Sequence, residues 1–244
     1  MGRAKLHTEA PAPDNGAKIL QFKIWLKGIS PMIWRRVQSP ASTTLRELHG
    51  IFQVAMGWEG VHLFLFNLRT ANFGSWQLGG RSPDISLGEL QLHRGARFIY
   101  KYDLNIPWEH EVRLEAELPL KPGRAYPHCV EGNASCPPED CRGIADFLAR
   151  RDAWVSEEGL EDLAAVADFV DQVVLRERRD LLKDDALIEE MRNVLERAEA
   201  RHSWQGQPFS RKAVNARLKN GDHLALMHQQ QGWRGRALSD LARA

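Results

Sequence analysis

The cysteines are the residues of this chain best suited to chemistry, and all three lie in one short stretch. The stretch CVEGNASCPPEDCRG (129–143) contains Cys129, Cys136 and Cys141 among adjacent prolines and several acids. An odd number of cysteines disfavours a complete set of structural disulfides. The spacing also lacks the CxxC pairs that are typical of zinc fingers.

A closed zinc site needs a fourth ligand beside three thiolates, and an imidazole nitrogen is suitable. His110 is the candidate, because the alternation of WEHEVRLEAEL (108–118) places its side chain on the apolar face of a strand. One hypothesis is a structural zinc ion with the ligands Cys129, Cys136, Cys141 and His110. Two alternatives remain open: loop cysteines that bind nothing, and a redox or nucleophilic thiol.

Carboxylates close to the cysteines and the histidine form a second candidate site. These acids are Asp103, Glu109, Glu139 and Asp140. Paired carboxylates can divide acid and base roles or hold a divalent ion, and His110 would complete such a catalytic group. The alternative is structural, since Glu109 falls on the polar face of its strand. An acid after the double proline can also cap the helix that begins near Gly143.

Two adjacent arginines, Arg35 and Arg36, follow Trp34 in the stretch MIWRRVQ (32–38). An extended backbone sends neighbouring side chains to opposite faces of the sheet. One of the arginines, beside Trp34 or Trp25, is a candidate contact for phosphate or another anion. The alternative is a structural ion pair with an acid of the motif.

The elements that must position these residues follow from hydrophobic periodicity. Extended patterns predict strands at about 18–27, 32–38, 96–104 and 108–118, of which the first two form a hairpin. The run VHLFLFNL (61–68), apolar on both faces, predicts a central strand. Helical spacing predicts helices at about 44–57, 86–92, 144–150 and 156–200, and one more that begins after Ser210. On the long helical segment an apolar stripe consists of Leu160, Leu163, Ala167, Val170 and Val174.

This order of elements favours an α+β fold, a mostly antiparallel sheet packed with helices and followed by a helical C-terminal region from about residue 144. We expect the domain to span residues 18–219. Residues 1–17 are predicted to be a flexible leader, because they lack the apolar core of a signal peptide. Residues 220–244 are predicted to be a tail.

The composition limits the classes of function. With 43% hydrophobic residues and a formal net charge of +1, the chain is typical of soluble globular proteins and lacks a bulk excess of base for nucleic acid. No apolar run is long enough to span a membrane. An odd cysteine count without an export signal predicts a cytoplasmic protein. Basic stretches such as SRKAVNARLKN (210–220) keep a nucleic-acid or protein partner open.

Several segments together resemble the plasmid pRiA4b ORF-3-like family, whose members are also labelled TnpR-like passenger proteins of insertion elements. The segments are SPMIWRRV (30–37), LRELHGIFQVAMGWEGVHLFLF (45–66), YKYDLNIPWEHEV (100–112), YPHCVEGNASCPPEDCRG (126–143) and WQGQPFSRKAVNARL (204–218). The resemblance covers roughly residues 18–219. It implies an α+β domain on an antiparallel sheet and genes on plasmids and other mobile elements, but no defined activity.

The chain also departs from the family pattern. The family has a second aspartate before its Trp-Glu-His-Glu strand, where this chain has Leu104-Asn105-Ile106-Pro107, and it has Phe-Asp-Pro near the late tryptophan, where this chain has Gln207-Pro208-Phe209. If those carboxylates serve catalysis in the family, this chain lacks them.

These observations lead to three functional hypotheses. The first is a non-enzymatic binding or accessory protein of a mobile-element-associated family, with the cysteine-rich stretch docked on the Trp-Glu-His-Glu strand and tied by structural zinc. The second is an enzyme that acts on nucleic acid or a nucleotide through His110 and a neighbouring carboxylate or a metal. The third is a protein-interaction module that uses the charged C-terminal helices.

Overall fold

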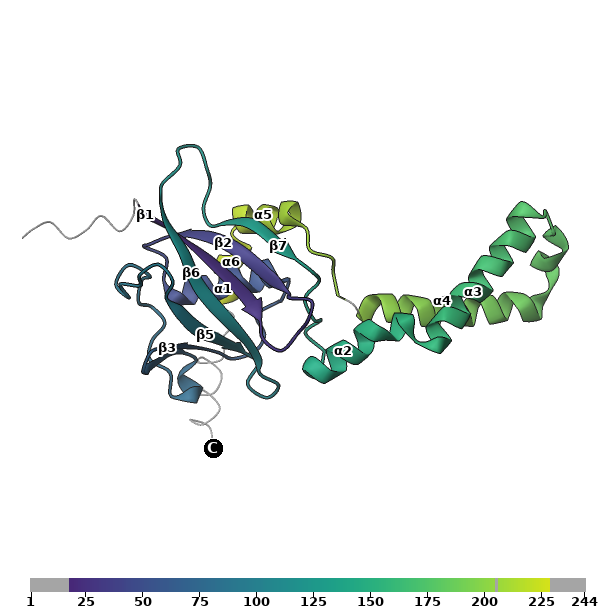
Figure 1. Ribbon diagram of the computed structural model, residues 1–244, viewed down its shortest axis with the longest axis horizontal. Coiled ribbons are helices and arrows are strands. Elements are labelled where there is room, and N and C mark those ends of the chain that lie inside the picture. The colour runs from purple at the N-terminus through teal and green to yellow at the C-terminus, as the bar shows by residue number, and fades with distance from the viewer. Residues whose placement is uncertain (1–17, 205, 229–244) are drawn as a thin grey trace, which may run out of the picture.

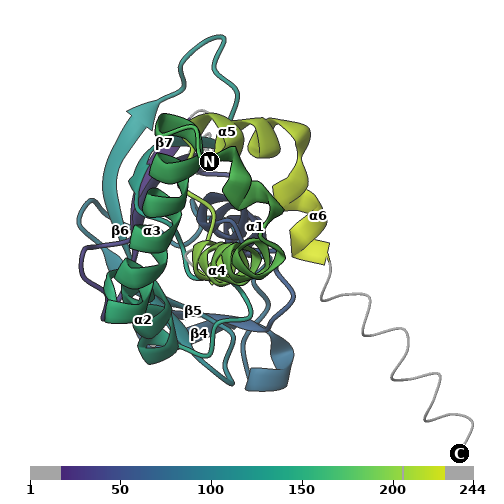
Figure 2. The ribbon, with the colours of Figure 1, turned by 90° about the vertical axis from the view of Figure 1, so that its right-hand side faces the viewer.

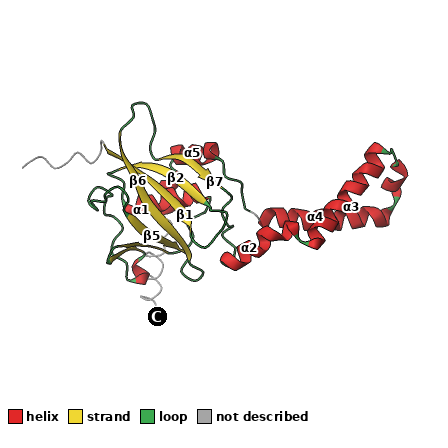
Figure 3. Cartoon of the chain, viewed as in Figure 1, coloured by secondary structure: helices red, strands yellow, loops and turns green. Residues whose placement is uncertain are grey.

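A seven-stranded antiparallel sheet organises the first part of the chain in the computed structural model, which describes residues 18–204 and 206–228 (Figures 1 and 3). The strands are β1 (Lys18–Leu26), β2 (Trp34–Pro40), β3 (Phe64–Leu68), β4 (Ala71–Gly74), β5 (Arg97–Tyr102), β6 (Trp108–Pro119) and β7 (His128–Asn133). They are ordered β4-β3-β5-β6-β1-β2-β7. The α+β fold predicted from periodicity is therefore confirmed.

Strand pairing follows the predicted alternation. β1 and β2 form the expected hairpin, and β6 lies on the other side of β1, with Leu26 opposite His110. On β6 the side chains of Trp108, His110 and Val112 are buried while their neighbours are partly exposed. At the other edge β7 pairs with β2. Cys129 thus lies on a strand, whereas the other two cysteines lie in the segment of residues 134–143, named the cysteine-rich loop from here on.

The helices comprise α1 (Leu45–Met56), α2 (Ile144–Asp152), α3 (Glu157–Val170), α4 (Asp185–Trp204), α5 (Arg211–Asn220) and α6 (Asp222–His228). Short helical turns are η1 (Trp76–Leu78), η2 (Ala153–Val155), η3 (Asp171–Leu175) and η4 (Arg179–Lys183). Figure 2 shows α1, α5 and α6 on the same side of the sheet.

α1 is the helix that sequence signals define best. The side chain of Thr44 accepts a hydrogen bond from the Glu47 amide, and Glu47 accepts one from the Thr44 amide, which is the predicted capping box. The helix ends at Gly57, whose φ of 94° suits glycine. Most side chains of α1 are buried, so the helix forms the centre of the core under the sheet.

The long helical segment predicted for 156–200 is two helices. α3 and α4 run antiparallel and project from the sheet as a helical arm, defined as residues 153–204 (Figure 1). The turn between them contains Glu177 with a φ of 54°, and Asp184 accepts hydrogen bonds from the first amides of α4. The aspartate cap is a helix start that periodicity alone does not show.

The predicted tail begins with a helix. α6 packs on α1, and Gly50 permits this packing because a Cβ atom there would collide with the His223 backbone. His223 and Leu226 are buried as a result. The predicted leader, 1–17, and the rest of the predicted tail, 229–244, lie outside the described residues. Among the helices that the structure describes, none combines the length and apolarity needed to cross a membrane.

Candidate functional site

A cavity of about 620 Å³ lies beside the cysteine-rich loop and is named the loop cleft. Its walls come from the end of α1 (54–59), from loop residues 136–139, from the segment 206–210 and from the start of α5. These segments all belong to the motifs that resemble one family, which are far apart in the sequence, and His202 of α4 also lines the cleft. The loop cleft is therefore the place where those motifs meet.

Arg35 lines the loop cleft from β2 and is only 1% exposed. Its guanidinium donates to the carbonyl oxygens of Ala55 (2.8 Å), Trp34 (2.8 Å), Asn133 (2.8 Å) and Ala134 (3.0 Å) and to the thiol of Cys136 (3.7 Å). The ring of Phe209 lies over the guanidinium at 4.3 Å. In the described part of the chain none of its partners is a carboxylate.

The cysteine-rich loop is held by the segment that follows α1 and by β5. The indole of Trp58 donates to the Pro137 carbonyl at 2.7 Å, and the hydroxyl of Tyr102 donates to Glu139. The second oxygen of Glu139 accepts the Glu59 amide at 2.8 Å. Desolvation and the nearby Glu139 raise the pKa of Tyr102, so its hydroxyl stays a donor. Glu139 is thus a structural anchor of the loop.

The predicted docking of the loop on the Trp-Glu-His-Glu strand is indirect. Trp58 lies between them, with its ring 6.2 Å from Trp108 and 5.4 Å from His110. The segment after α4 rests on the loop from the other side, because a Cβ atom on Gly206 would collide with the Cys136 carbonyl. Sequence reasoning missed the contribution of Phe209, although its segment was part of the resemblance.

The three thiols occupy separate surroundings. Cys129 exchanges backbone hydrogen bonds with the Asn215 side chain of α5 (both 2.8 Å), and the Cys136 sulfur contacts the Met56 sulfur at 3.2 Å. The Cys141 thiol donates to Asp146 at 3.5 Å. Burial raises the pKa of each thiol to about 11.

These positions bear on the zinc hypothesis. Residues 18–204 and 206–228 contain no group of three or more His, Cys, Asp or Glu side chains that is placed to hold a metal ion. In this arrangement the Arg35 guanidinium donates to Cys136, where a zinc ion would need a thiolate. Zinc ligation by Cys129, Cys136, Cys141 and His110 stays a prediction.

His110 is fully buried, as the alternation predicts. Its ring packs between Tyr100 (5.2 Å) and Trp58 (5.4 Å), and Nδ1 lies 3.3 Å from the Tyr100 carbonyl. Burial lowers the pKa of His110 to about 4, although its backbone hydrogen bonds favour the charged form. The imidazole is therefore neutral at pH 7.

The carboxylates of the second candidate site do not gather around His110. Glu109 points to the other face and pairs with Lys27 (2.9 Å) and Lys101 (2.8 Å), which lower the pKa of Glu109 to about 2. Asp140 lies 3.4 Å from Arg150 at the surface.

Two further acids have local structural roles. Asp103 has a φ of 54° and accepts the Asn105 amide at 3.2 Å. Neither Glu139 nor Asp140 caps α2, because Gly143 is the N-cap residue and Asp146 accepts the Arg142 amide instead. A catalytic role for any of these acids stays a prediction.

Arg36 lies on the sheet face opposite to Arg35, as predicted for an extended strand. Its guanidinium pairs with Glu115 (2.6 Å) and Glu131 (2.6 Å) and lies 5.2 Å from the ring of Trp34. Arg36 thus forms structural ion pairs, while Arg35 lines the loop cleft.

A polar cluster that the sequence does not reveal lies in the core next to His110. The Tyr100 hydroxyl bonds to Nδ1 of His49 at 2.7 Å and accepts the Gln53 amide at 2.8 Å. His49 also stacks on Phe64, with ring centroids 3.8 Å apart. Among the residues that the structure describes, none is a hydrogen-bond partner of Nε2 of His49, Oε1 of Gln53 or Nε2 of His110. These buried atoms make the core polar between α1 and β5.

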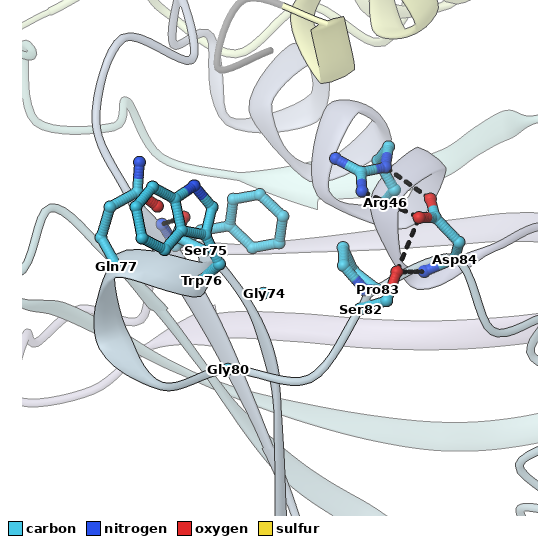
Figure 4. A pocket seen from close by; sticks show the side chains of 10 residues that line it. Arg46, Gly74, Ser75, Trp76, Gln77, Gly80, Ser82, Pro83 and Asp84 are labelled. Atoms are coloured by element: carbon cyan, nitrogen blue, oxygen red, sulfur yellow. Dashed lines mark hydrogen bonds and ion pairs between the residues drawn. The ribbon is translucent and has the colours of Figure 1, made fainter. Parts of the chain in front are cut away.

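A second cavity, of about 520 Å³, lies beyond the edge strand β4 (Figure 4). Trp76 and Gln77 form one side, and the Arg46–Asp84 ion pair forms the other, with nitrogen–oxygen distances of 2.6 and 3.0 Å. The carboxylate neutralises the arginine of this cavity. In the loop cleft, by contrast, the guanidinium of Arg35 donates to carbonyl oxygens.

Comparisons with known proteins find a family model, a related protein and a similar solved structure. The family model described as plasmid pRiA4b ORF-3-like protein matches residues 18–172. The uncharacterized protein y4hQ of Sinorhizobium fredii (strain NBRC 101917 / NGR234) is 35% identical over 169 residues, which cover 61% of this chain and 87% of that protein.

The crystal structure of a protein of unknown function, MM3350 from Methanosarcina mazei Go1, is also similar. It is 31% identical, has a TM-score of 0.54, and the match covers 58% of this chain and 84% of that chain. The family match ends inside η3, so α4, α5 and α6 lie outside the matched residues.

Proposed function

The chain belongs to the plasmid pRiA4b ORF-3-like family, and from this premise we propose that it is a non-enzymatic binding protein whose ligand site is the loop cleft. The ligand class is a small organic anion with an apolar body. The observation that carries the proposal is the buried Arg35 guanidinium, which lines the cleft and has only carbonyl, thiol and ring partners.

Carbonyl dipoles satisfy the hydrogen-bond donors of Arg35 but leave its net charge in place. A buried charge without an opposite charge is costly, so the cleft wall favours an anion. Arg217 lines the same cleft but is neutralised by Asp222 (3.0 Å) and Glu59 (3.9 Å). Arg35 is therefore the source of the attraction for an anion.

The remaining lining supports an apolar ligand body. The apolar side chains on the cleft wall are Val54, Met56, Trp58, Pro137, Pro138 and Phe209. The cavity volume of about 620 Å³ lies in the range of small-molecule sites. Phe209 covers the guanidinium face, so a planar anionic ligand is expected to take its place over Arg35.

Two arguments favour binding over catalysis. The two acids that line the cleft have structural contacts: Glu139 accepts hydrogen bonds from Tyr102 and the Glu59 amide, and the Glu59 carboxylate lies 3.9 Å from Arg217. His110 is enclosed by aromatic rings and has a low pKa, so it is poorly placed to exchange protons with a ligand. An accessory role on a plasmid or other mobile element, in the cytoplasm, fits the family and stays a prediction.

Calorimetric titration with phenylacetate, with phenylacetamide as its uncharged match, tests the proposal. We expect binding of phenylacetate that is at least about tenfold tighter, because only the acid meets the charge of Arg35. Ala213→Trp fills the cleft from α5 and should abolish binding. Ala216→Trp, on the same helix and outside the cleft lining, should keep it. Equal binding of both compounds, or binding that survives Ala213→Trp, would contradict the proposal.

The zinc prediction has a separate test. Protein purified under reducing conditions is analysed for metal by mass spectrometry, with Cys136→Ser as the matched variant. Stoichiometric zinc that the variant loses would support the prediction. Its absence from the wild-type protein would rule out a tightly bound structural zinc, and the binding proposal does not depend on the result.

A further inference from the structure

The helical arm exposes an apolar stripe with regular spacing. In the stripe Leu160, Leu163, Val170 and Val174 are exposed by 56, 47, 46 and 63%, and Ala167 is exposed too. The other face of α3 packs on α4, where Asp162 is buried between Arg197 and Arg201, at 2.5 Å from each. α3 thus has one face covered within the arm and a second apolar face that no described residue covers.

The spacing of the exposed stripe is that of a coiled-coil seam. Its members follow one another at three, four, three and four residues, which is the a/d pattern of a heptad repeat. From Leu160 to Val170 the seam lies on α3 and is about 15 Å long at 1.5 Å per residue, and Val174 continues it in the π-helical turn η3. An apolar seam of this length on a projecting element is typical of a protein-interaction surface. The stripe therefore fits another helix with the same spacing.

Charge indicates which helix that is. α3 and the first residue of η3 carry the acids Glu157, Glu158, Glu161, Asp162, Asp168 and Asp171 and no base. The arm tip that follows, residues 176–180, carries Arg176, Arg178 and Arg179 against Glu177 and Asp180, a net charge of +1. Arg176 pairs with Asp171 (2.7 Å) and Arg178 with Asp180 (2.9 Å) at the surface, where such ion pairs are weak. The end of the seam opposite to the acidic start of α3 is therefore the more basic end.

We propose that the stripe binds the same stripe of a second copy of this chain, with the two α3 helices antiparallel. In this arrangement Ala167 lies on the twofold axis and faces Ala167 of the second copy, while Leu160 faces Val174. The acidic start of each α3 then lies beside the arginines of the other arm tip, which can exchange their surface ion pairs for it, and the helix dipoles oppose each other favourably. A parallel pair would instead place the acidic ends side by side, which is unfavourable.

Cysteine cross-linking under mild oxidation distinguishes the arrangements. We expect Ala167→Cys to form a covalent dimer, because residue 167 meets itself only across the axis. Leu160→Cys alone should not cross-link, whereas Leu160→Cys with Val174→Cys should. The native thiols are buried, so the background is low. Efficient dimers of Leu160→Cys alone would overturn the antiparallel arrangement.

Sedimentation velocity over a wide concentration range tests self-association of the full chain. The wild-type protein is expected to dimerise, and Leu163→Glu should weaken the dimer by at least about tenfold. Leu195→Glu is the matched control, since Leu195 is as exposed on α4 but lies off the stripe. Circular dichroism checks that both variants keep their helices. A monomeric wild-type protein at all concentrations would overturn the proposal in favour of a different partner.

Charge reversal provides an independent readout of the same arrangement. Arg176→Glu with Arg178→Glu should weaken the dimer, and so should Glu157→Lys with Glu158→Lys. Mixing the two variants should restore association as a heterodimer, because each supplies the charge that the other lacks at one contact. Absence of restoration, with both variants folded, would count against the proposed pairing.

Discussion

Arg35 and Arg36 are neighbours in the sequence with opposite energetic roles. Arg36 pairs with carboxylates at the surface, where screening by water keeps an ion pair weak. Arg35 connects β2, the end of α1 and the turn after β7 through its four carbonyl acceptors. A single buried side chain thus joins the sheet, the helix and the cysteine-rich loop.

Replacing Arg35 by methionine is expected to lower the free energy of unfolding by at least about 3 kcal/mol. The change removes the donors to four carbonyl groups, one in a buried and three in part-buried hydrogen bonds, and each lost bond costs about 1 kcal/mol. Arg36→Met is the matched control and should cost about 1 kcal/mol or less. Urea denaturation measures both values. Similar losses for the two variants would contradict the assigned role of Arg35.

The buried histidines predict a pH dependence of stability. Burial lowers the pKa of His110 to about 4 and that of His49 to about 3, from an ordinary value of 6.5. Below pH 6.5 the unfolded chain takes up protons that the folded chain refuses, so stability falls as the pH drops from about 6.5 to 4. Each histidine contributes up to about 1.4 kcal/mol per pH unit.

Urea denaturation at several pH values checks this slope. His110→Gln should reduce the slope of the unfolding free energy against pH by the contribution of one proton, whatever the stability of the variant at pH 7. His93→Gln changes an exposed histidine and should leave the slope as it is. Carboxylates such as Glu109, whose pKa is lowered from 4.5 to about 2, begin to affect stability below about pH 5.5, so the histidine slope is read above that pH. An unchanged slope in His110→Gln would show that this histidine titrates normally.

For single residues, the sequence predicts the face of a strand to which a side chain points better than it predicts the residues that the side chain contacts. The period of two places His110 inward and sends Arg35 and Arg36 to opposite faces, because side-chain alternation is a local property of a strand. It does not predict that Cys129 meets Asn215 or that Cys141 meets Asp146. Those contacts depend on how the loop and α5 pack, which spacing along the chain does not encode.

Elements with local signals are predictable in the same way. The capping box of α1 and the alternation of β1 and β6 define those elements from nearby residues alone. The separation of α3 from α4 is missed, because the helical periodicity continues through the turn and only Asp184 marks the new start. α6 is missed because its position depends on a distant glycine, Gly50.

Gly206 lies in the segment that joins the arm to α5, and its replacement tests whether this segment packs on the cysteine-rich loop. Gly206→Ala should destabilise the protein by more than the roughly 1 kcal/mol that a left-handed alanine costs, because the added Cβ collides with the Cys136 carbonyl. Gly123→Ala is the control, with a similar φ of 76° instead of 72° and no atom near the new Cβ. Thermal unfolding compares the two, and equal effects would mean that the segment does not rest on the loop.

The whole molecule combines a dense domain with a sparsely packed arm (Figure 1). The core joins the sheet with α1, whereas few residues of the arm are buried, among them Gly159, Asp162, Val194 and Arg201. Apolar burial stabilises the domain, so its stability does not depend on the arm. The loop cleft is lined mainly by the domain, with His202 of the arm at its wall, and the exposed stripe lies on other residues of the arm, so ligand binding and self-association can be tested with different variants.

Hydrogen exchange should reveal this difference in packing. Amides of β1, β6 and α1 are expected to exchange by global unfolding, while those of α3 and α4 exchange faster through local opening, since the arm buries little apolar surface. Raising the protein concentration should then slow exchange in α3, where the stripe becomes covered, and leave β6 unchanged. Leu163→Glu should remove this concentration effect. If the amides of α3 are as protected as those of β6 in dilute protein, the arm is not an independently opening unit.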